Sequence, residues 1–208
     1  LRADIEALCG QKVPLLSRLP DAEPALPCLL LVATVGRPEV ERIVRARGMN
    51  PRPMLGQREA YLIQRLPPRK PGELHLLALL GADPFGTRRA VYALCETLGM
   101  DPMAPFTGFV PPYRPEVSVE GYLEPSPGPT PPVKWRGVFI NDEERIKMWM
   151  SEDATTIPAG VFERLFETLV RSDGNMLAPP MFYTDYMTPE SRQRCHDYGI
   201  WYTASHME

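Results

Sequence analysis

Apolar positions in the first half of the chain form unbroken runs that alternate with helical stripes. Residues 28–35 (CLLLVATV) are almost wholly apolar, which is typical of a strand that is covered on both faces. The predicted strands cover residues 28–35, 61–66 and 74–80, and the predicted helices cover residues 38–48 and 90–99, each closed by a glycine. This alternation predicts a small N-terminal α/β domain.

A proline-rich segment, residues 124–132 (EPSPGPTPP), interrupts the alternation. Proline has no amide hydrogen to donate to a sheet, and proline-rich segments favour an extended backbone. We therefore expect a stiff spacer, with an N-terminal domain over residues 1–123 and a second domain over residues 133–208.

The pattern after the spacer predicts strand, helix, strand, helix, strand. The predicted strands cover residues 133–140, 175–182 and 200–205, and the helices begin at Pro158 and, with Thr188 as N-cap, at Pro189. Strands joined through single helices are parallel, with right-handed crossovers. Because an eight-stranded barrel takes ~250 residues, we predict the first three βα units of an incomplete (β/α)8 TIM-like barrel. We expect the chain to be the N-terminal part of a larger protein.

Composition narrows the function classes. The 208 residues carry a formal net charge of −3, which gives no electrostatic footprint for nucleic acid or an anionic membrane. No apolar run approaches the ~20 residues of a membrane span. The four cysteines are scattered without metal-ligand spacing, so neither a disulfide framework nor structural zinc is predicted.

Polar residues follow each strand of the predicted second domain. They are Asn141, Asp142 and Glu143 after the first strand, Asp185 after the second, and His206 and Glu208 after the third. Ligands of parallel α/β folds bind at the carboxyl ends of the strands. With strands ~4.8 Å apart, carboxylates on the first and third loops would lie roughly 10 Å apart, near the ~6.5–9.5 Å between acid and base in inverting glycosidases. The spacing permits this chemistry without requiring it.

Each of these residues also has a structural interpretation. Asp142 or Glu143 would stabilise the start of a following helix. Asp185 would be a surface charge near a turn, and His206 a partly buried imidazole. The three tryptophans are expected in the core rather than as sugar platforms.

Residues 135–143 (WRGVFINDE) resemble the start of the catalytic barrel in glycoside hydrolase family 115, the xylan α-1,2-glucuronidases, which carry R-G-[IV]-F-I-N-D-E there. Three more segments resemble this family in the same order. Residues 81–96 are similar to its G-S-D-x-R-G-T-x-Y-G-x-Y-x-x-S-E helix start, residues 161–175 to the helix before its second strand, and residues 198–208 to its Y-G-I…S-H-H-E-P-M segment.

The resemblance implies an inverting enzyme that removes glucuronic acid or 4-O-methyl-glucuronic acid side groups from xylan, without an organic cofactor. By position it assigns the following residues to substrate binding: Glu143, Asp185 and Glu208, with Asn141, Asp142 and His206 beside them. The catalytic acid and base are expected on later barrel strands, beyond residue 208, so we expect this chain alone to be inactive. The resemblance also implies a uronic-acid-bearing polysaccharide such as glucuronoxylan as partner, no metal ligands, an extracytoplasmic location, and a homodimer as an option at full length.

The chain departs from the family pattern in four places, one of which is Asp185, which stands alone where the family usually has an acidic pair. Residues 178–182 (APPMF) stand where W-P-A-M-W is usual, Met207 stands where a second histidine is expected, and Phe85 replaces an arginine. A diverged, non-catalytic carbohydrate-binding relative is therefore the main alternative. A free-standing α/β domain with an unrelated small-molecule pocket is the third.

Overall fold

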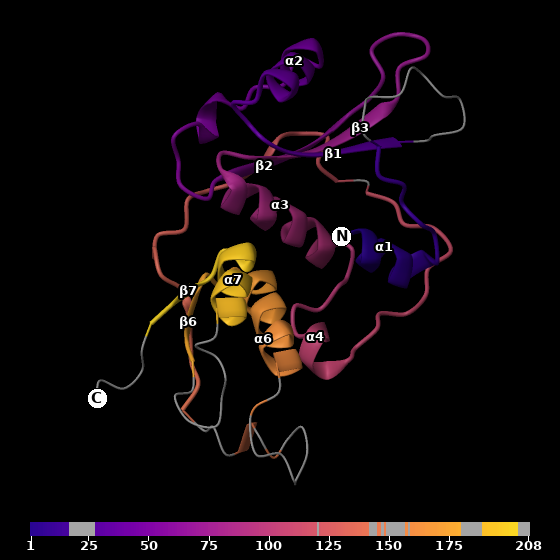
Figure 1. The fold of residues 1–208 in the computed structure, drawn as a ribbon. Coiled ribbons are helices and arrows are strands. Elements are labelled where there is room, and N and C mark those ends of the chain that lie inside the picture. Colours follow the sequence, from indigo (N-terminus) through magenta and orange to yellow (C-terminus); the bar gives the residue numbers. More distant parts are fainter. Residues whose placement is uncertain are drawn as a thin grey trace. The chain divides into compact units, whose positions relative to one another are not determined.

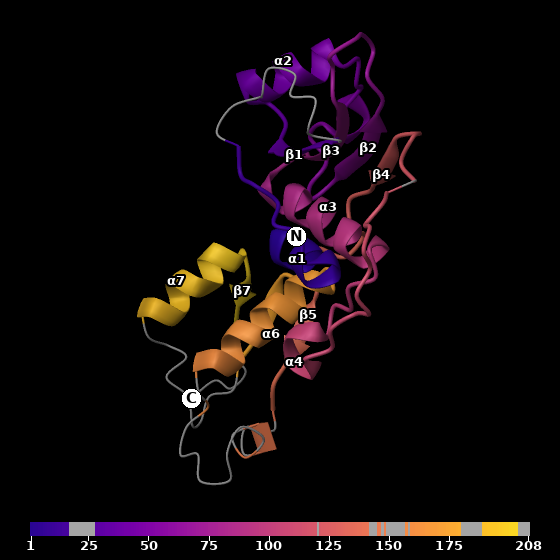
Figure 2. The ribbon, with the colours of Figure 1, turned by 90° about the vertical axis from the view of Figure 1, so that its right-hand side faces the viewer.

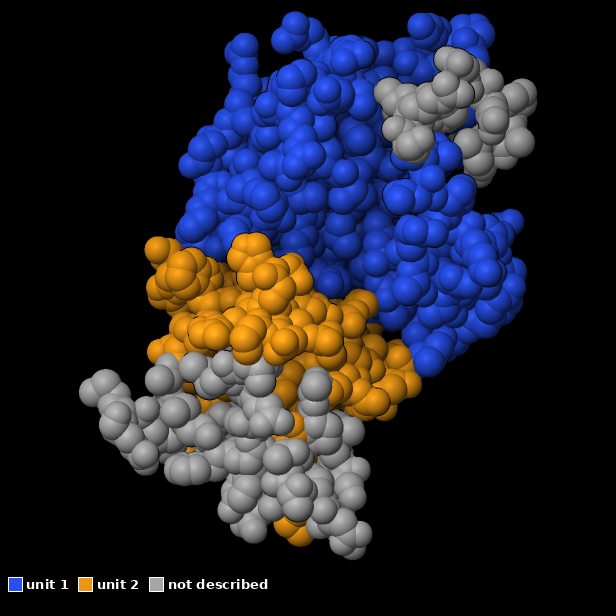
Figure 3. Space-filling model, in the orientation of Figure 1, with its two compact units in different colours: residues 1–100, 110–132 blue, residues 101–109, 133–208 orange. Residues whose placement is uncertain are grey.

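The computed structural model describes residues 1–16, 28–119, 121–141, 145–146, 148, 157, 159–179 and 189–203. The chain forms two compact units, which Figure 3 shows in different colours. Unit 1 comprises residues 1–100 and 110–132, and unit 2 comprises residues 101–109 and 133–208. Both are mixed α/β structures with parallel strand pairs.

Unit 1 is built on a four-stranded mixed sheet in the order β1-β3-β2-β4. Its strands are β1 (Cys28–Thr34), β2 (Tyr61–Leu66), β3 (His75–Gly81) and β4 (Ser126–Gly128). Its helices are α1 (Arg2–Cys9), α2 (Pro38–Ala46), the short 3-10 helix η1 (Arg52–Met54) and α3 (Pro84–Thr97). β1 pairs with β3 in parallel, whereas β2 is antiparallel to both β3 and β4.

Both faces of this sheet carry a hydrophobic core, because the side chains of a strand alternate between faces. On β3, Leu76, Ala78 and Leu80 point to the face that α2 and η1 cover. Leu77 and Leu79 point to the opposite face, which α1 and α3 cover. Figure 1 shows α2 on one side of the sheet and α3 on the other. The expected α/β character of the N-terminal region is thus confirmed, and all residues of its central strand β3 except His75 are buried.

Two expectations about unit 1 are wrong. Residues 28–35 were expected to be covered on both faces, but β1 is at the edge of the sheet and leaves the Val32 side chain 43% exposed. Residues 124–132 were expected to be a spacer that takes no part in a sheet, but Ser126–Gly128 pairs with β2 as β4. Proline is tolerated there because an edge strand needs no donor on its outer side.

Unit 2 contains a three-stranded parallel sheet in the sequential order β5-β6-β7. Its strands are β5 (Gly137–Phe139), β6 (Met176–Ala178) and β7 (Trp201–Tyr202). Its helices are α4 (Ala104–Thr107), α6 (Ala159–Arg171) and α7 (Pro189–Tyr198). The predicted parallel strand–helix–strand order is confirmed, and the helix α7 begins at the predicted Pro189 and ends before Gly199, which has a positive φ of 64°. Pro158 and Thr188, expected at the starts of the two helices, lie outside the described residues.

The helices α6 and α7 cover one face of this sheet. Figures 1 and 2 show both helices on the same side of the strands, and the rings of Phe166 and Tyr198 join them with their centroids 5.5 Å apart. Leu177 of the central strand is completely buried on that side.

The other face of the unit 2 sheet is apolar and open in the part of the chain that the structure describes. Trp201 and Phe139 are 60% and 51% exposed, and Trp135 packs edge-on against Trp201 with ring centroids 5.0 Å apart. Two of the three tryptophans are therefore not in the core, contrary to the expectation. They lie on the face that no described helix covers. Trp149 lies outside the described residues.

Candidate functional site

The three strands of unit 2 end at one edge of the sheet. Phe139 is in register with Ala178, and Leu177 is in register with Tyr202. The ladder continues for one step beyond the strands, since Ile140 N–H donates to Ala178 O and Thr203 N–H to Leu177 O, both at 3.0 Å. Residues that directly follow the strands are thereby brought to a common edge, as parallel pairing requires.

Asn141 is the one predicted site residue that the structure describes. It is exposed and comes two residues after the end of β5, at the predicted edge of the sheet. The other five residues lie outside the described residues: Asp142, Glu143, Asp185, His206 and Glu208. The described geometry therefore supports the placement of the edge, and the roles of the five residues stay predictions.

The opposite, amino edge of the sheet is fixed by a polar lock that sequence reasoning missed. Asn175, which is buried, accepts from Arg136 N–H through its Oδ1 at 2.9 Å and donates to Lys134 O through its Nδ2 at 2.8 Å. The Arg136 guanidinium donates in turn to Asp173 O at 2.8 Å. Asn175 O also accepts from Trp201 N–H at 2.8 Å, so one asparagine ties together the starts of all three strands.

A close backbone approach explains the glycine beside this lock. A Cβ atom on Gly137 would collide with the carbonyl oxygen of Met176 on the neighbouring strand. The Arg136-Gly137 pair, which begins the stretch that resembles the family's R-G-[IV]-F-I-N-D-E segment, therefore sets the register of β5 and β6. The signal that could have revealed the lock is an asparagine placed between a glycine turn and an apolar strand, where a buried amide needs partners.

The loop over residues 81–87 in unit 1 also resembles the family, and its polar groups are engaged within the unit. Asp83 caps α3: its Oδ1 accepts from Gly86 N–H at 2.7 Å, and its Oδ2 accepts from Glu59 N–H at 2.9 Å. Thr87 and Thr34 share a hydrogen bond of 2.8 Å between their hydroxyls. A Cβ atom on Gly86 would collide with Ala60 O. These residues hold the helix α3 against the start of β2.

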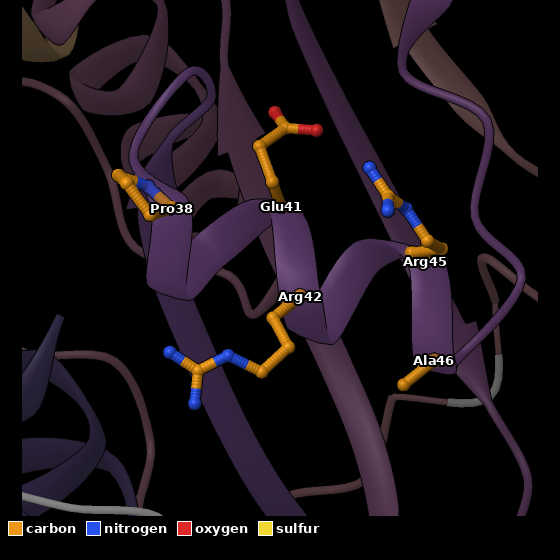
Figure 4. Close-up of a pocket in the computed structure, with 5 residues that line it drawn as sticks. All are labelled: Pro38, Glu41, Arg42, Arg45 and Ala46. Atoms are coloured by element: carbon orange, nitrogen blue, oxygen red, sulfur yellow. The ribbon is translucent and has the colours of Figure 1, made fainter.

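A surface hollow of about 510 Å³ lies along α2 and is lined by Pro38, Glu41, Arg42, Arg45 and Ala46. Figure 4 shows that Glu41 and Arg45 extend on one side of α2 and that Arg42 extends on the other. Their charges do not converge on one ligand-sized position, so this hollow is not a candidate site.

Metal and membrane features can be stated for the described residues. Within them, no three His, Cys, Asp or Glu side chains lie close enough together to hold a metal ion. No helix in the described ranges is both long and apolar enough to cross a membrane.

The sequence of unit 2 is similar to that of a known protein family. Residues 129–208 match the sequence profile of glycosyl hydrolase family 115. This part of the chain is therefore similar in sequence to that family. The matched segment contains the lock, the parallel sheet and all six predicted site residues.

The fold of the whole chain is similar to that of a solved family 115 protein. That protein is BtGH115A, a 4-O-methyl-α-glucuronidase with specificity for decorated arabinogalactans, and the TM-score is 0.79 at 22% sequence identity. The match covers 100% of this chain and 26% of the other, so this chain spans about a quarter of the length of that family 115 structure. No curated protein matches the chain.

Proposed function

We propose that the chain supplies the first part of the substrate pocket of an α-glucuronidase, within an incomplete (β/α)8 barrel. The observation that carries the proposal is the sheet of unit 2, whose three parallel strands lie in sequential order with the connecting helices α6 and α7 on one face. A doubly wound sheet places helices on both faces, whereas a barrel keeps them all outside. The open apolar face with Trp201 and Phe139 would then be the barrel interior.

The proposed substrate is a polysaccharide that carries glucuronic acid or 4-O-methyl-glucuronic acid side groups, such as glucuronoxylan or a decorated arabinogalactan. The first follows from the family resemblance and the second from the activity of BtGH115A. We keep inversion of configuration as part of the proposal. The catalytic acid and base would lie on other strands of the barrel, so the chain by itself would be inactive.

The six predicted residues would divide the work of binding a uronic acid. Ionised Glu143, Asp185 and Glu208 accept hydrogen bonds and suit the hydroxyl groups of a sugar. The carboxylate of the substrate needs donors instead, because acidic side chains repel it. The amide of Asn141 and the imidazole of His206 would supply these donors, and Asp142 would orient one of them.

The proposal is tested by measuring uronic acid released from glucuronoxylan and from a glucuronic-acid-bearing arabinogalactan by the protein at its full natural length. We expect release from at least one of them, and a loss of about a hundredfold or more in kcat/KM for Asn141→Ala and Glu143→Gln. Gln193→Ala, an exposed change on α7, is the matched control and should retain activity.

Binding without release would favour the non-catalytic alternative. That alternative is motivated by the sequence APPMF at residues 178–182, where the family carries two tryptophans. Absence of both release and binding, or full activity of both variants, would overturn the proposed pocket.

A further inference from the structure

Unit 1 contains a pocket that the proposed glucuronidase site does not use. It has a volume of about 300 Å³ and lies between residues 50–57 and β4, over the first residues of β2. Five of its twelve described lining residues are prolines: Pro51, Pro53, Pro125, Pro127 and Pro129. None of the described lining residues is charged, so the pocket favours a neutral, largely apolar ligand.

The two walls of this pocket are held in place before any ligand binds. On the β4 side, Arg89 Nη1 donates to Pro129 O at 2.9 Å and to Glu59 O at 2.7 Å, and Arg58 Nη2 donates to Pro131 O at 3.0 Å. Gly128 lies so close to the ring of Tyr61 that a Cβ atom would collide with it. A ligand therefore pays little entropy to order the site.

The opposite wall offers one donor and one acceptor. Asn50 Oδ1 accepts from Arg52 N–H at 3.2 Å, which leaves the Asn50 amide NH₂ to donate to a ligand. Gln57 Nε2 donates to Pro53 O at 3.0 Å, which leaves Gln57 Oε1 to accept. A ligand with one hydroxyl and one carbonyl group would match this pair.

The apolar lining suits an aromatic ring. Proline-rich peptides bind in grooves lined by aromatic side chains because the flat pyrrolidine ring packs on an aromatic face. Here the partners are exchanged, since the protein supplies the prolines. Met54 adds a thioether, which contacts aromatic rings favourably. An engineered cavity of ~150 Å³ holds benzene, so this pocket has room for one ring with substituents.

From these observations we infer that the pocket binds a single neutral aromatic ring that carries a phenolic hydroxyl and an ester or similar carbonyl group. The inference is independent of the proposed glucuronidase function, because the described lining residues all belong to unit 1 and do not include any of the six predicted site residues.

The experiment is an NMR titration of the 208-residue chain with methyl 4-hydroxybenzoate. For a ligand of this size we expect a dissociation constant of about 1 mM. The double variant Pro53→Ser/Pro125→Ser removes two exposed rings from opposite walls and should weaken binding about tenfold. The matched control, Pro68→Ser/Pro71→Ser, changes two exposed prolines outside the pocket and should leave the affinity unchanged.

Two further measurements isolate the chemistry. The saturated analogue methyl 4-hydroxycyclohexanecarboxylate should bind several-fold more weakly if the prolines select an aromatic face. Gln57→Leu should weaken binding of the phenol but not of methyl benzoate, which lacks the hydroxyl. It changes an exposed side chain, so it tests the site even if the proline variant does not fold.

Absence of saturable binding by the unmodified chain would overturn the inference. Equal binding of the saturated analogue would overturn the aromatic assignment, and equal weakening by the control prolines would overturn the location.

Discussion

The sheets of the two units differ in how much of their surface the chain itself covers. The three long strands of unit 1 have seven, six and seven residues, and helices bury both faces of their sheet. The strands of unit 2 have three, three and two residues, and α6 and α7 cover one face only. A parallel sheet is normally buried on both faces.

Within the described residues, unit 1 therefore buries more of its apolar strand surface than unit 2 does. Unit 1 removes most of its apolar strand surface from water by itself, and apolar burial is the main favourable term in folding. Unit 2 leaves Trp201 and Phe139 largely exposed, so apolar burial stabilises it less within the described residues. We therefore expect unit 1 to be the more stable of the two and unit 2 to depend strongly on its backbone ladder.

The largest effect is expected from Gly137→Ala. Its Cβ would collide with Met176 O across the β5–β6 ladder, and the short strands have few other contacts that could absorb the shift. We expect a loss of about 3 kcal/mol in the stability of unit 2. The matched control is Gly160→Ala on α6, where a Cβ meets nothing within 4 Å, and it should be neutral or stabilising by up to ~1 kcal/mol.

Labelling of two buried cysteines can measure the local opening of each unit separately. Cys195 lies in unit 2 and Cys95 in unit 1, and both are almost completely buried. In a Cys28→Ser background, which removes the exposed thiol, the rate of thiol labelling at each position follows local opening. Gly137→Ala should accelerate labelling of Cys195 and leave Cys95 unchanged. Equal acceleration at both would show that the units open together and would contradict the comparison.

A smaller loss is expected from Asn175→Ala. The change removes the two hydrogen bonds that the Asn175 side chain makes, one to Lys134 O and one from Arg136 N–H. Both hydrogen bonds are partly buried, and a hydrogen bond contributes about 0.5–1.5 kcal/mol to stability, so we expect unit 2 to lose about 2 kcal/mol. Labelling of Cys195 measures it, with the exposed Gln193→Ala as a control within about 0.5 kcal/mol of the parent chain. An Asn175→Ala chain as stable as this control would show that the lock is not needed.

Long apolar runs and glycine or proline boundaries were enough to predict most of the elements. β2 has the predicted residues 61–66, and α7 begins and ends where Pro189 and Gly199 indicate. Such signals are local, so they survive without knowledge of the partner strands. The edge position of β1 and the pairing of β4 depend instead on which strands pair with each other. Neither an apolar run nor the number of prolines indicates the partner of a strand.

The sequence allowed the edge of the sheet that carries the candidate site to be predicted, but not the contacts between its residues. The parallel order of β5, β6 and β7 follows from single-helix connections, and it places Asn141 at the expected end. The lock around Asn175 was not predictable in the same way, because Asn175 and Arg136 are far apart in sequence and meet only when the register is fixed. Arg136 and Gly137, the first two residues of the stretch that resembles the family, thus fix the pairing of β5 and β6.

An effect of about 1–2 kcal/mol on unit 1 is expected from Asp83→Ala. The substitution removes the N-cap of α3 and both acceptors for Gly86 and Glu59 N–H. Labelling of Cys95, on the same helix, should accelerate about tenfold, while Cys195 should be unchanged. Asp83→Asn keeps one side-chain oxygen as an acceptor and should recover part of the loss. A larger response at Cys195 than at Cys95 would contradict the independence of the units.

The smallest expected effect is on how the stability of unit 1 depends on pH. Glu73 Oε2 accepts from Arg69 N–H at 2.6 Å and Oε1 pairs with Arg47 at 2.8 Å, and these contacts, the backbone bond first, lower the pKa of the Glu73 carboxyl. A carboxyl whose pKa is lower in the folded state stabilises that state above its unfolded pKa of about 4.3, and the contribution fades as the pH falls through the folded value. Glu73→Gln should therefore destabilise unit 1 slightly at pH 7 and make no difference well below pH ~4. Urea unfolding followed by labelling of Cys95 at the two pH values measures this, with Cys195 as the internal control. A difference that persists undiminished in acid would mean that Glu73 acts through its shape and packing, and that the link between α2 and the β2–β3 loop owes nothing to charge.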